Sequence, residues 1–215
     1  MKKIAIVLAG SGVYDGAEIH EATLAMLAIA RNGAQYQCFA PDIDQAHVVN
    51  HLTGEEMPET RNVLVEAARI ARGKIKPLSE YSAKEYDALV FPGGFGVAKN
   101  LFTYAFDGTN CSVNPEVEKA IKSTVIEEKP IGALCISPVL MAKVLVDVEV
   151  TIGNEDAASS AIETFGATHI EKTHGEIVYD EKYKLVTTPC YMLDATIDQI
   201  ADGAENVIKK ILEIA

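Results

Sequence analysis

Short apolar runs alternate with amphipathic segments along most of this chain of 215 residues. The apolar run IAIVLA at 4–9 is followed by an amphipathic segment at 18–33 and then by a second strand-like run at 34–41. The amphipathic segment closes with Arg-Asn-Gly, a combination typical of a helix C-terminus. A strand, a helix and a second strand in this order predict a βαβ unit, and therefore a parallel sheet.

The same alternation continues to the end of the chain. We expect further helices at 61–73, 115–128, 138–145 and 155–166. We expect further strands at 74–81 (a weak edge strand), 88–92, 131–134 and 149–153, and a hairpin at 176–188. A last helix should bury the face formed by Leu193, Ile197, Ile200, Ala204, Val207 and Ile211. Together these elements predict an α/β fold, with helices on both faces of a mostly parallel sheet.

One segment, 41–60, breaks this rhythm and has weak periodicity. We expect a single domain over 1–215, in which 41–60 is inserted above the sheet edge as a loop with a short helix. The N-terminal stretch MKKIAIVLAGSG resembles a signal peptide, but its apolar run is short and fits a buried first strand better.

The composition argues against several classes of partner. With 31 acidic and 19 basic residues the formal charge is -12, so nucleic-acid binding is not expected. No segment approaches the roughly 20 apolar residues that a membrane helix needs. The four cysteines, Cys38, Cys111, Cys135 and Cys190, form no C-x-x-C pair, which favours reduced thiols in a cytoplasmic protein over a zinc or dithiol site.

The segment PIGALCISPVL at 130–140 places a cysteine between a predicted strand and a predicted helix. A nucleophile elbow needs small residues two positions on either side of the nucleophile, and Ala133 and Ser137 meet this requirement in part. Ser137 can be the N-cap and Pro138 the first helical residue, which puts Cys135 beside free N–H groups. That position favours the thiolate and indicates a reactive cysteine, although a buried cysteine more often serves as a small apolar residue.

A glycine loop, PGGFG, follows the strand at 88–92 and meets the elbow at the carboxyl ends of the strands. Backbone amides of Gly93 and Gly94 can join that of Ile136 to form an oxyanion hole. An ordinary strand-to-helix turn would have the same glycines.

The third segment at this edge, GSGVYDGAEIHE, carries Glu18, His20 and Glu21. A carboxylate aimed at the thiol would act as a general base or, when protonated, would hydrogen-bond a thiolate. Either glutamate can instead compensate the helix dipole, and these residues alone leave that choice open.

A dinucleotide fingerprint overlaps the same segment, because a Gly-x-Gly follows the first strand and Asp42 closes the second. The third glycine is missing and Gly16 comes one position late, so we expect no NAD binding. The remaining histidines, His47, His51, His169 and His174, lack metal-ligand spacing, and we expect no metal site. Cys111 reads as a loop thiol, and Cys190 follows a strand and can lie at the site rim, although a structural role is the plainer interpretation.

Taken together, the three segments resemble the ThiJ/PfpI superfamily, whose members share the class I glutamine amidotransferase-like fold. The strings GVYDGAEIHEA, NHLTGEEMPETRNVLVEAARIARG, FPGGFGVAKNL and VTTPCYML are similar to the ElbB branch of lycopene-biosynthesis-enhancing, glyoxalase-like proteins. The resemblance runs along nearly the whole chain and implies a flavodoxin-like three-layer sandwich, a homodimer and a weak, cofactor-independent activity on glyoxal.

Matched by motif, the resemblance assigns the elbow cysteine to Cys135, the acid to Glu21 rather than Glu18, and the oxyanion donors to the amides of Gly94 and Ile136. Family members with catalytic triads often carry a histidine directly after the cysteine or later in the chain. Here Ile136 follows, which argues against amide hydrolysis and glutaminase activity.

We therefore expect a glyoxalase-like lyase that converts a small dicarbonyl, glyoxal or methylglyoxal, to a hydroxy acid. Cys135 would form a hemithioacetal and Glu21 would act as the general base. Gly93, Glu18, His20 and Cys190 are the expected rim. The alternative is a non-enzymatic redox or electrophile sensor, or an accessory protein of isoprenoid metabolism, that uses the same Cys135–Glu21 pair.

Overall fold

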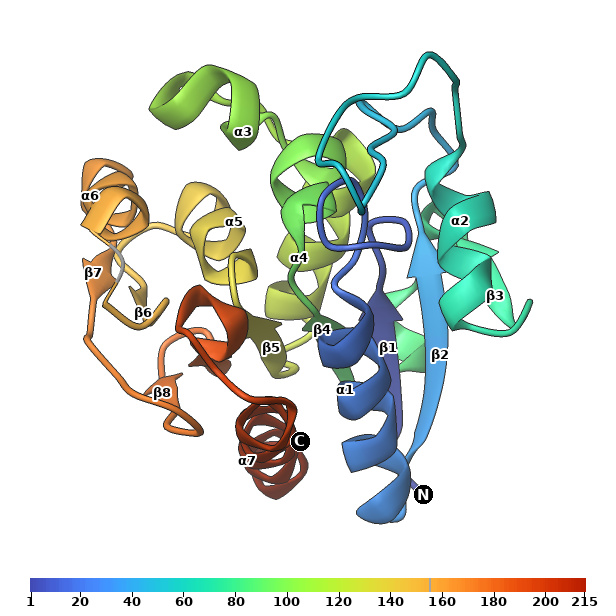
Figure 1. Cartoon of the computed structure of the whole chain (residues 1–215). Helices are drawn as coiled ribbons and strands as arrows, with labels where there is room; N and C mark the ends of the chain where they lie inside the picture. Colours follow the sequence, from blue (N-terminus) through green and yellow to red (C-terminus); the bar gives the residue numbers. More distant parts are fainter. Residues whose placement is uncertain (155) are drawn as a thin grey trace.

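A seven-stranded sheet lies between layers of helices in the computed structural model, which describes residues 1–154 and 156–215 (Figure 1). Its strands are β1 (Lys3–Val7), β2 (Gln35–Ala40), β3 (Ile75–Pro77), β4 (Ala88–Phe91), β5 (Ile131–Leu134), β8 (Val178–Asp180) and β9 (Leu185–Thr188). Their order in the sheet is β3-β2-β1-β4-β5-β9-β8, and every neighbouring pair is parallel except β8 with β9. The predicted mostly parallel sheet, its edge strand β3 and the C-terminal hairpin are confirmed.

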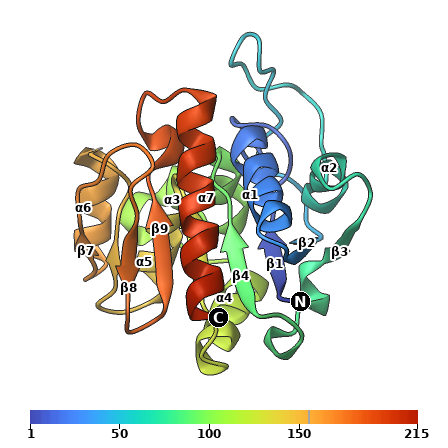
Figure 2. The ribbon, with the colours of Figure 1, turned by 90° about the horizontal axis from the view of Figure 1, so that it is seen from below.

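Helices pack on both faces of this sheet. They are α1 (Ile19–Arg31), α2 (Val63–Ile70), α3 (Tyr104–Asp107), α4 (Pro115–Ile126), α5 (Ser137–Val144), α6 (Asp156–Thr164) and α7 (Ile197–Ile214). Short 3-10 turns span Leu78–Glu80, Ala83–Glu85, Gly108–Asn110 and Cys190–Met192, and a π-helical turn spans Val97–Leu101. Figure 2 shows α1 and α7 side by side on one face, while α4 and α5 lie on the other. The first residue of the helix expected at 155–166, Glu155, lies outside the described residues.

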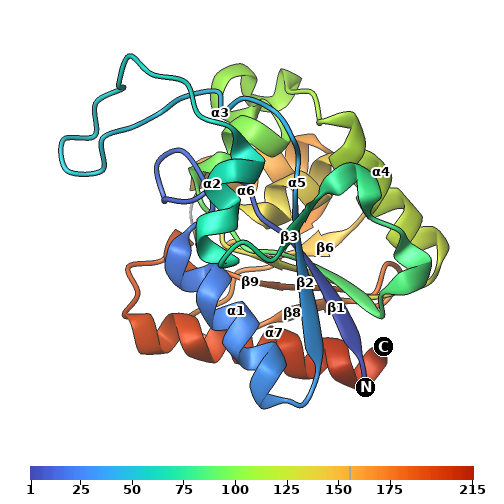
Figure 3. The same ribbon diagram turned by 90° about the vertical axis from the view of Figure 1, so that its right-hand side faces the viewer.

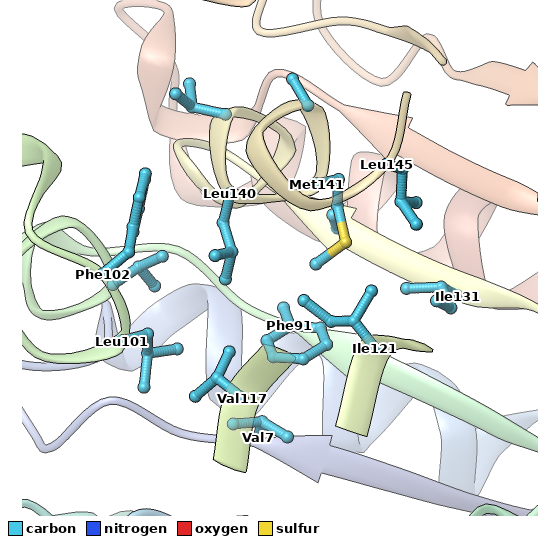
Figure 4. Packing of buried hydrophobic residues seen from close by; sticks show 14 of the residues in the cluster. Val7, Phe91, Leu101, Phe102, Val117, Ile121, Ile131, Leu140, Met141 and Leu145 are labelled. Carbon is cyan, nitrogen blue, oxygen red and sulfur yellow. The ribbon is translucent and has the colours of Figure 1, made fainter. Parts of the chain in front are cut away.

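Strand β1 is apolar at every position from Ile4 to Val7 because both of its faces are covered. Ile4 and Ile6 belong to the core between the sheet and α1, α2 and α7, whereas Ala5 and Val7 belong to the core under α4 and α5. Successive side chains of a strand point to opposite faces, so a central strand of a covered sheet has no solvated face. In the second core, Phe91 and Ile131 of the sheet face Val117 and Ile121 of α4, and Leu140 and Met141 of α5 (Figure 4).

Two predicted details differ in the structure. The buried face of α7 consists of Ile200, Gly203, Ala204, Val207, Ile208 and Ile211. Leu193 precedes the helix and Ile197 is 53% exposed, because the helix begins at Ile197 and its first turn extends past the sheet. The strand expected at 149–153 is reduced to β6 (Glu149–Val150), which pairs with β7 (Thr168–His169) in a separate two-stranded sheet.

Residues 41–60, all of which the structure describes, form a loop that projects from the molecule, and the short helix expected there is wrong (Figure 3). Backbone groups of the segment itself, as in the hydrogen bond from the Met57 amide to the Val48 carbonyl, and side chains of other segments satisfy its backbone in place of helical hydrogen bonds. The amide of Ala46 donates to Asn100 Oδ1 at 2.9 Å, and the amide of Val49 donates to Asp15 Oδ2 at 2.7 Å. No helix in the described part of the chain is long and apolar enough to cross a membrane.

Candidate active site

The turn after β5 presents Cys135 at the carboxyl edge of the sheet. Cys135 has a φ of 59°, a left-handed conformation that is costly for a residue with a side chain and must be held by its surroundings. Its amide donates to the carbonyl of Thr188 at the end of β9 at 3.1 Å. The predicted strand, sharp turn and helix around this cysteine are therefore present.

Ser137 does not cap α5, contrary to the prediction. Ile136 occupies the N-cap position, Pro138 lies in the first turn, and the buried Ser137 hydroxyl donates to the carbonyl of Pro92 at 2.8 Å. The hydroxyl faces the loop after β4 instead of its own helix, because that loop leaves a buried carbonyl within reach. This hydrogen bond joins the elbow to the glycine loop.

Glu21, in the first turn of α1, is fully buried and reaches the sulfur of Cys135 with its carboxyl group. Its Oε2 accepts a hydrogen bond from the Gly93 amide at 2.8 Å, and its Oε1 accepts one from the Tyr191 amide at 3.3 Å. Glu18 has a different position: it is the N-cap of α1, and its Oε2 accepts from the Glu21 amide at 2.7 Å. Of the two glutamates between which the residues alone did not decide, Glu21 lies at the sulfur and Glu18 caps the helix.

The glycine loop approaches the elbow too closely for any side chain. A Cβ atom at Gly93 would lie 2.4 Å from the Cβ of Cys135 and 2.7 Å from Glu21 Oε2. Gly94 has a φ of +101°, which favours glycine. The amides of Gly94 and Ile136 both contact the Cys135 sulfur, so the structure brings together all four residues of the predicted catalytic set.

Burial dominates the electrostatics of this pair. It raises the pKa of Glu21 from its ordinary value of 4.5 to about 7, with the charge of Glu18 adding to the rise. Burial, followed by the negative charge of Glu21, also raises the pKa of Cys135 well above 9, and this outweighs the opposing contacts from the Gly94 and Ile136 amides. The expectation that the helix N-terminus favours the thiolate is thus reversed, mainly by burial and further by the charge of Glu21. Transfer of the thiol proton to Glu21 removes that opposing charge.

A cavity of about 440 Å³ opens beside the sulfur. Its lining consists of Val13, Glu18, Gly94, Phe95, Tyr104, Cys135, Ile136, Ala157, Ala158, Tyr191 and Met192. His20 is not in this lining; it is exposed at the rim, where its Nδ1 lies 2.8 Å from the Tyr191 hydroxyl. The other histidines are also absent from the lining, and the described residues include no cluster suited to hold a metal ion.

Cys190, expected at the site rim, and Cys111, expected in a loop, are both buried. Cys190 has a φ of 45°, and a Cβ at Gly203 of α7 would lie 3.5 Å from its Sγ. Burial and then the charge of Glu21 raise the pKa of Cys190 well above 9. Cys190 is buried near the site but is not part of the cavity lining. Cys111 is in a loop as expected, but it is 4% exposed and packs in the core under α4 and α5.

Several lining residues were not predicted. Tyr191 follows β9 at the carboxyl edge of the sheet, so its position in PCYM was a usable signal. Phe95, directly after the two glycines, was another. Tyr104 of α3 and Ala157 of α6 reach the cavity only through tertiary packing, and neither segment carries a motif.

Comparison with known proteins places the chain in a family, although no model of a known protein family matches it. The human protein "glutamine amidotransferase-like class 1 domain-containing protein 3, mitochondrial" is 48% identical over 222 residues, covering 99% of this chain and 83% of that protein. The structure of an isoprenoid biosynthesis protein with an amidotransferase-like domain from Ehrlichia chaffeensis has a TM-score of 0.93 and 36% identity, covering 100% of this chain and 99% of that one. A ThiJ/PfpI domain protein from Brachyspira murdochii, 18% identical over 99% of this chain and 96% of its own, shares the fold with a TM-score of 0.60. The chain therefore belongs to the class I glutamine amidotransferase-like proteins, and it shares the fold of the ThiJ/PfpI proteins.

Proposed function

We propose that the protein is a cofactor-independent, glyoxalase-like enzyme that converts glyoxal or methylglyoxal to the corresponding hydroxy acid. One observation carries this proposal: the fully buried carboxyl of Glu21 reaches the sulfur of Cys135, which the amides of Gly94 and Ile136 also contact. A nucleophile, a proton carrier and two backbone donors are the groups that addition to an aldehyde requires.

Each step of the proposed reaction uses a group of this site. The Cys135 thiol gives its proton to Glu21 while the sulfur bonds to the aldehyde carbon, and the Gly94 and Ile136 amides stabilise the resulting oxyanion, which becomes the hydroxyl of a hemithioacetal. Glu21 then removes the proton from that carbon to form an enediol and returns it to the neighbouring carbon, which leaves a 2-hydroxyacyl thioester on Cys135. Water cleaves the thioester, releases the hydroxy acid and restores the thiol. The reaction adds one water to the dicarbonyl, with no external oxidant or reductant.

Burial makes Glu21 suitable for this role. A carboxyl group whose pKa is about 7 can both accept and return a proton near neutral pH. In the described part of the chain no histidine lines the cavity, which supports Glu21 as the proton carrier and argues against an amide-hydrolysing triad.

Steady-state turnover of methylglyoxal in the presence of a chelator tests the proposal. Cys135→Ala and Glu21→Gln should each lose all measurable turnover, whereas Cys111→Ala, a buried cysteine in the core under α4 and α5, is the matched control and should retain it. In the wild type, kcat/KM should rise with pH through about 7, because the Glu21 carboxyl loses its proton there and can then accept one from the thiol. Wild-type rates in either site variant would refute the mechanism.

A second candidate, a sensor of oxidants, is favoured by the same two amides. A sulfinate on Cys135 would accept hydrogen bonds from the Gly94 and Ile136 amides and from protonated Glu21. Two molecules of peroxide supply the two oxygens and leave as water. Mass spectrometry of Cys135 after mild peroxide treatment, alongside the turnover assay, separates the candidates: complete oxidation with negligible turnover supports the sensor.

We also propose a homodimer located in the cytoplasm, which analytical ultracentrifugation and cell fractionation would test. The human relative is named as a mitochondrial protein, so fractionation should include that compartment. The Ehrlichia relative is named as an isoprenoid biosynthesis protein, and an accessory role in that metabolism is the corresponding proposal for this chain.

A further inference from the structure

The cavity beside Cys135 is much larger than a small dicarbonyl needs. Its volume is about 440 Å³, whereas a water molecule occupies roughly 30 Å³ of the liquid, and glyoxal or methylglyoxal fills only the space of a few waters. A cavity of this size is typical of sites that enclose a much larger ligand. Either most of it stays hydrated during turnover, or a longer substrate fills it.

The walls of the cavity are mainly apolar. Beyond the reacting end, Val13, Phe95, Ile136 and Met192 contribute aliphatic and aromatic surface, and Tyr104 and Tyr191 add their rings. Phe95 lines the cavity and is 53% exposed, so its ring is accessible to a ligand there. These walls would gain little from contact with the two oxygens of a small dicarbonyl.

The described lining of the cavity contains a carboxylate and no basic side chain. Glu18 is the only carboxylate in the described lining, where the other ionisable groups are the Cys135 thiol and the hydroxyls of Tyr104 and Tyr191, and Glu21 lies behind the sulfur. Lys99 and His20 lie beside the lining without belonging to it: the Lys99 ammonium is 5.7 Å from the Phe95 ring centroid and donates to the Tyr14 carbonyl at 2.8 Å, and His20 pairs with the Tyr191 hydroxyl. A phosphate or carboxylate inside the cavity would therefore meet Glu18 with no basic side chain in the described wall to offset it.

We propose that this site binds a 2-oxoaldehyde whose tail, the part beyond the two carbonyl groups, is an uncharged apolar chain or ring. The tail binds against the walls formed by Val13, Phe95, Tyr104, Ile136 and Met192. The inference rests on the proposed function for the reacting end and goes beyond it for the tail. Each methylene that leaves water for an apolar wall improves binding roughly fourfold.

The first test compares kcat/KM for three 2-oxoaldehydes: methylglyoxal, 2-oxoheptanal, and an analogue of 2-oxoheptanal that ends in a carboxylate. We expect 2-oxoheptanal to exceed methylglyoxal by at least about tenfold, since part of the added chain stays near solvent at the half-exposed Phe95. The carboxylate analogue should lose that gain. Equal values for methylglyoxal and 2-oxoheptanal would overturn the inference.

A pair of phenylalanine variants tests the position of the tail. Phe95→Ala should reduce the ratio of the two kcat/KM values, 2-oxoheptanal over methylglyoxal, by several-fold, because it removes one wall. Phe106→Ala is the matched control, since Phe106 is 48% exposed but is not part of the lining. A ratio that responds equally to both variants would contradict a tail bound against Phe95.

Binding without turnover separates this inference from the proposed function. In Cys135→Ala protein, NMR titration with acetone, 2-heptanone and heptanoate should show 2-heptanone binding at least about tenfold more tightly than the other two. If no 2-oxoaldehyde is turned over by the wild type but this preference holds, the proposed function fails and the apolar-tail site stands. If methylglyoxal is turned over while 2-heptanone binds no better than acetone, the proposed function stands and this inference fails.

Discussion

Replacing Glu21 by glutamine should make the protein more stable above pH 7 while removing its activity. The carboxyl is fully buried, and its pKa rises from 4.5 to about 7 in the folded state. Between these values the folded protein keeps a proton that the unfolded chain releases, so the stability of the wild type falls as the pH rises. Each unit by which the folded-state pKa exceeds the unfolded-state pKa is worth about 1.4 kcal/mol. Keeping Glu21 ionised in the folded protein therefore costs about 3 kcal/mol at pH 8.

Glutamine has the same shape and no such cost. Its single oxygen accepts from only one of the two amides, Gly93 or Tyr191, which lowers the stability by about 1 kcal/mol at every pH. We therefore expect Glu21→Gln to be slightly less stable than, or equal to, the wild type at pH 5, and about 2 kcal/mol more stable at pH 8.

Urea unfolding at pH 5, 6, 7 and 8, with the free energy extrapolated to water, measures this difference. The informative quantity is its change between pH 5 and pH 8, about 2.5 kcal/mol, because the lost hydrogen bond cancels from it. Glu163→Gln, at an exposed position on α6, controls for the substitution itself. A difference between Glu21→Gln and wild type that stays constant from pH 5 to pH 8 would refute the reasoning.

Two further predictions concern packing around the site. Gly93→Ala should destabilise the protein by about 1 to 3 kcal/mol and lower kcat/KM about 100-fold, because the new methyl would overlap the Cys135 Cβ. Gly73→Ala is the control in urea unfolding and turnover assays: its φ of +76° strains an alanine, so it should lose stability, but its Cβ meets nothing within 4 Å and kcat/KM should be unchanged. Asn100→Ala should cost about 2 to 3 kcal/mol and accelerate hydrogen exchange at Ala46, since it leaves the Ala9 and Asp15 carbonyls and the Ala46 amide without their partner, and unchanged exchange at Ala46 would contradict this.

The sequence predicted the features that depend on local periodicity. The continuous apolar run of β1 and the proline at the start of α4 placed these elements within a few residues, because a strand in a sheet covered on both faces must be apolar on both sides. The elbow at Cys135 followed from a strand, small residues and Pro138 in close succession.

Features that depend on tertiary contacts could not be predicted in this way. The N-cap rule assumes that a hydroxyl faces its own helix, but Ser137 bonds the Pro92 carbonyl of another loop. The helix N-terminus argued for a thiolate, but the sequence contained no measure of how deeply Cys135 and Glu21 would be buried together. Side-chain oxygens of Asn100 and Asp15 accept hydrogen bonds from amides of the segment 41–60, which has no helix, over sequence separations that no local pattern reveals.

The hydrogen bonds between the three site loops have a consequence for how such a protein can evolve. Ser137 ties the elbow to Pro92, the Glu18 amide donates to the Gly93 carbonyl at 2.9 Å, and the Gly96 amide donates to the Gly16 carbonyl at 2.9 Å. An insertion or deletion in any one loop would shift the other two and move the sulfur away from its carboxyl partner. We expect changes of length to be tolerated at the tip of 41–60 around the exposed Leu52, whose amide bonds within that segment, while the three tied loops can change only as a set.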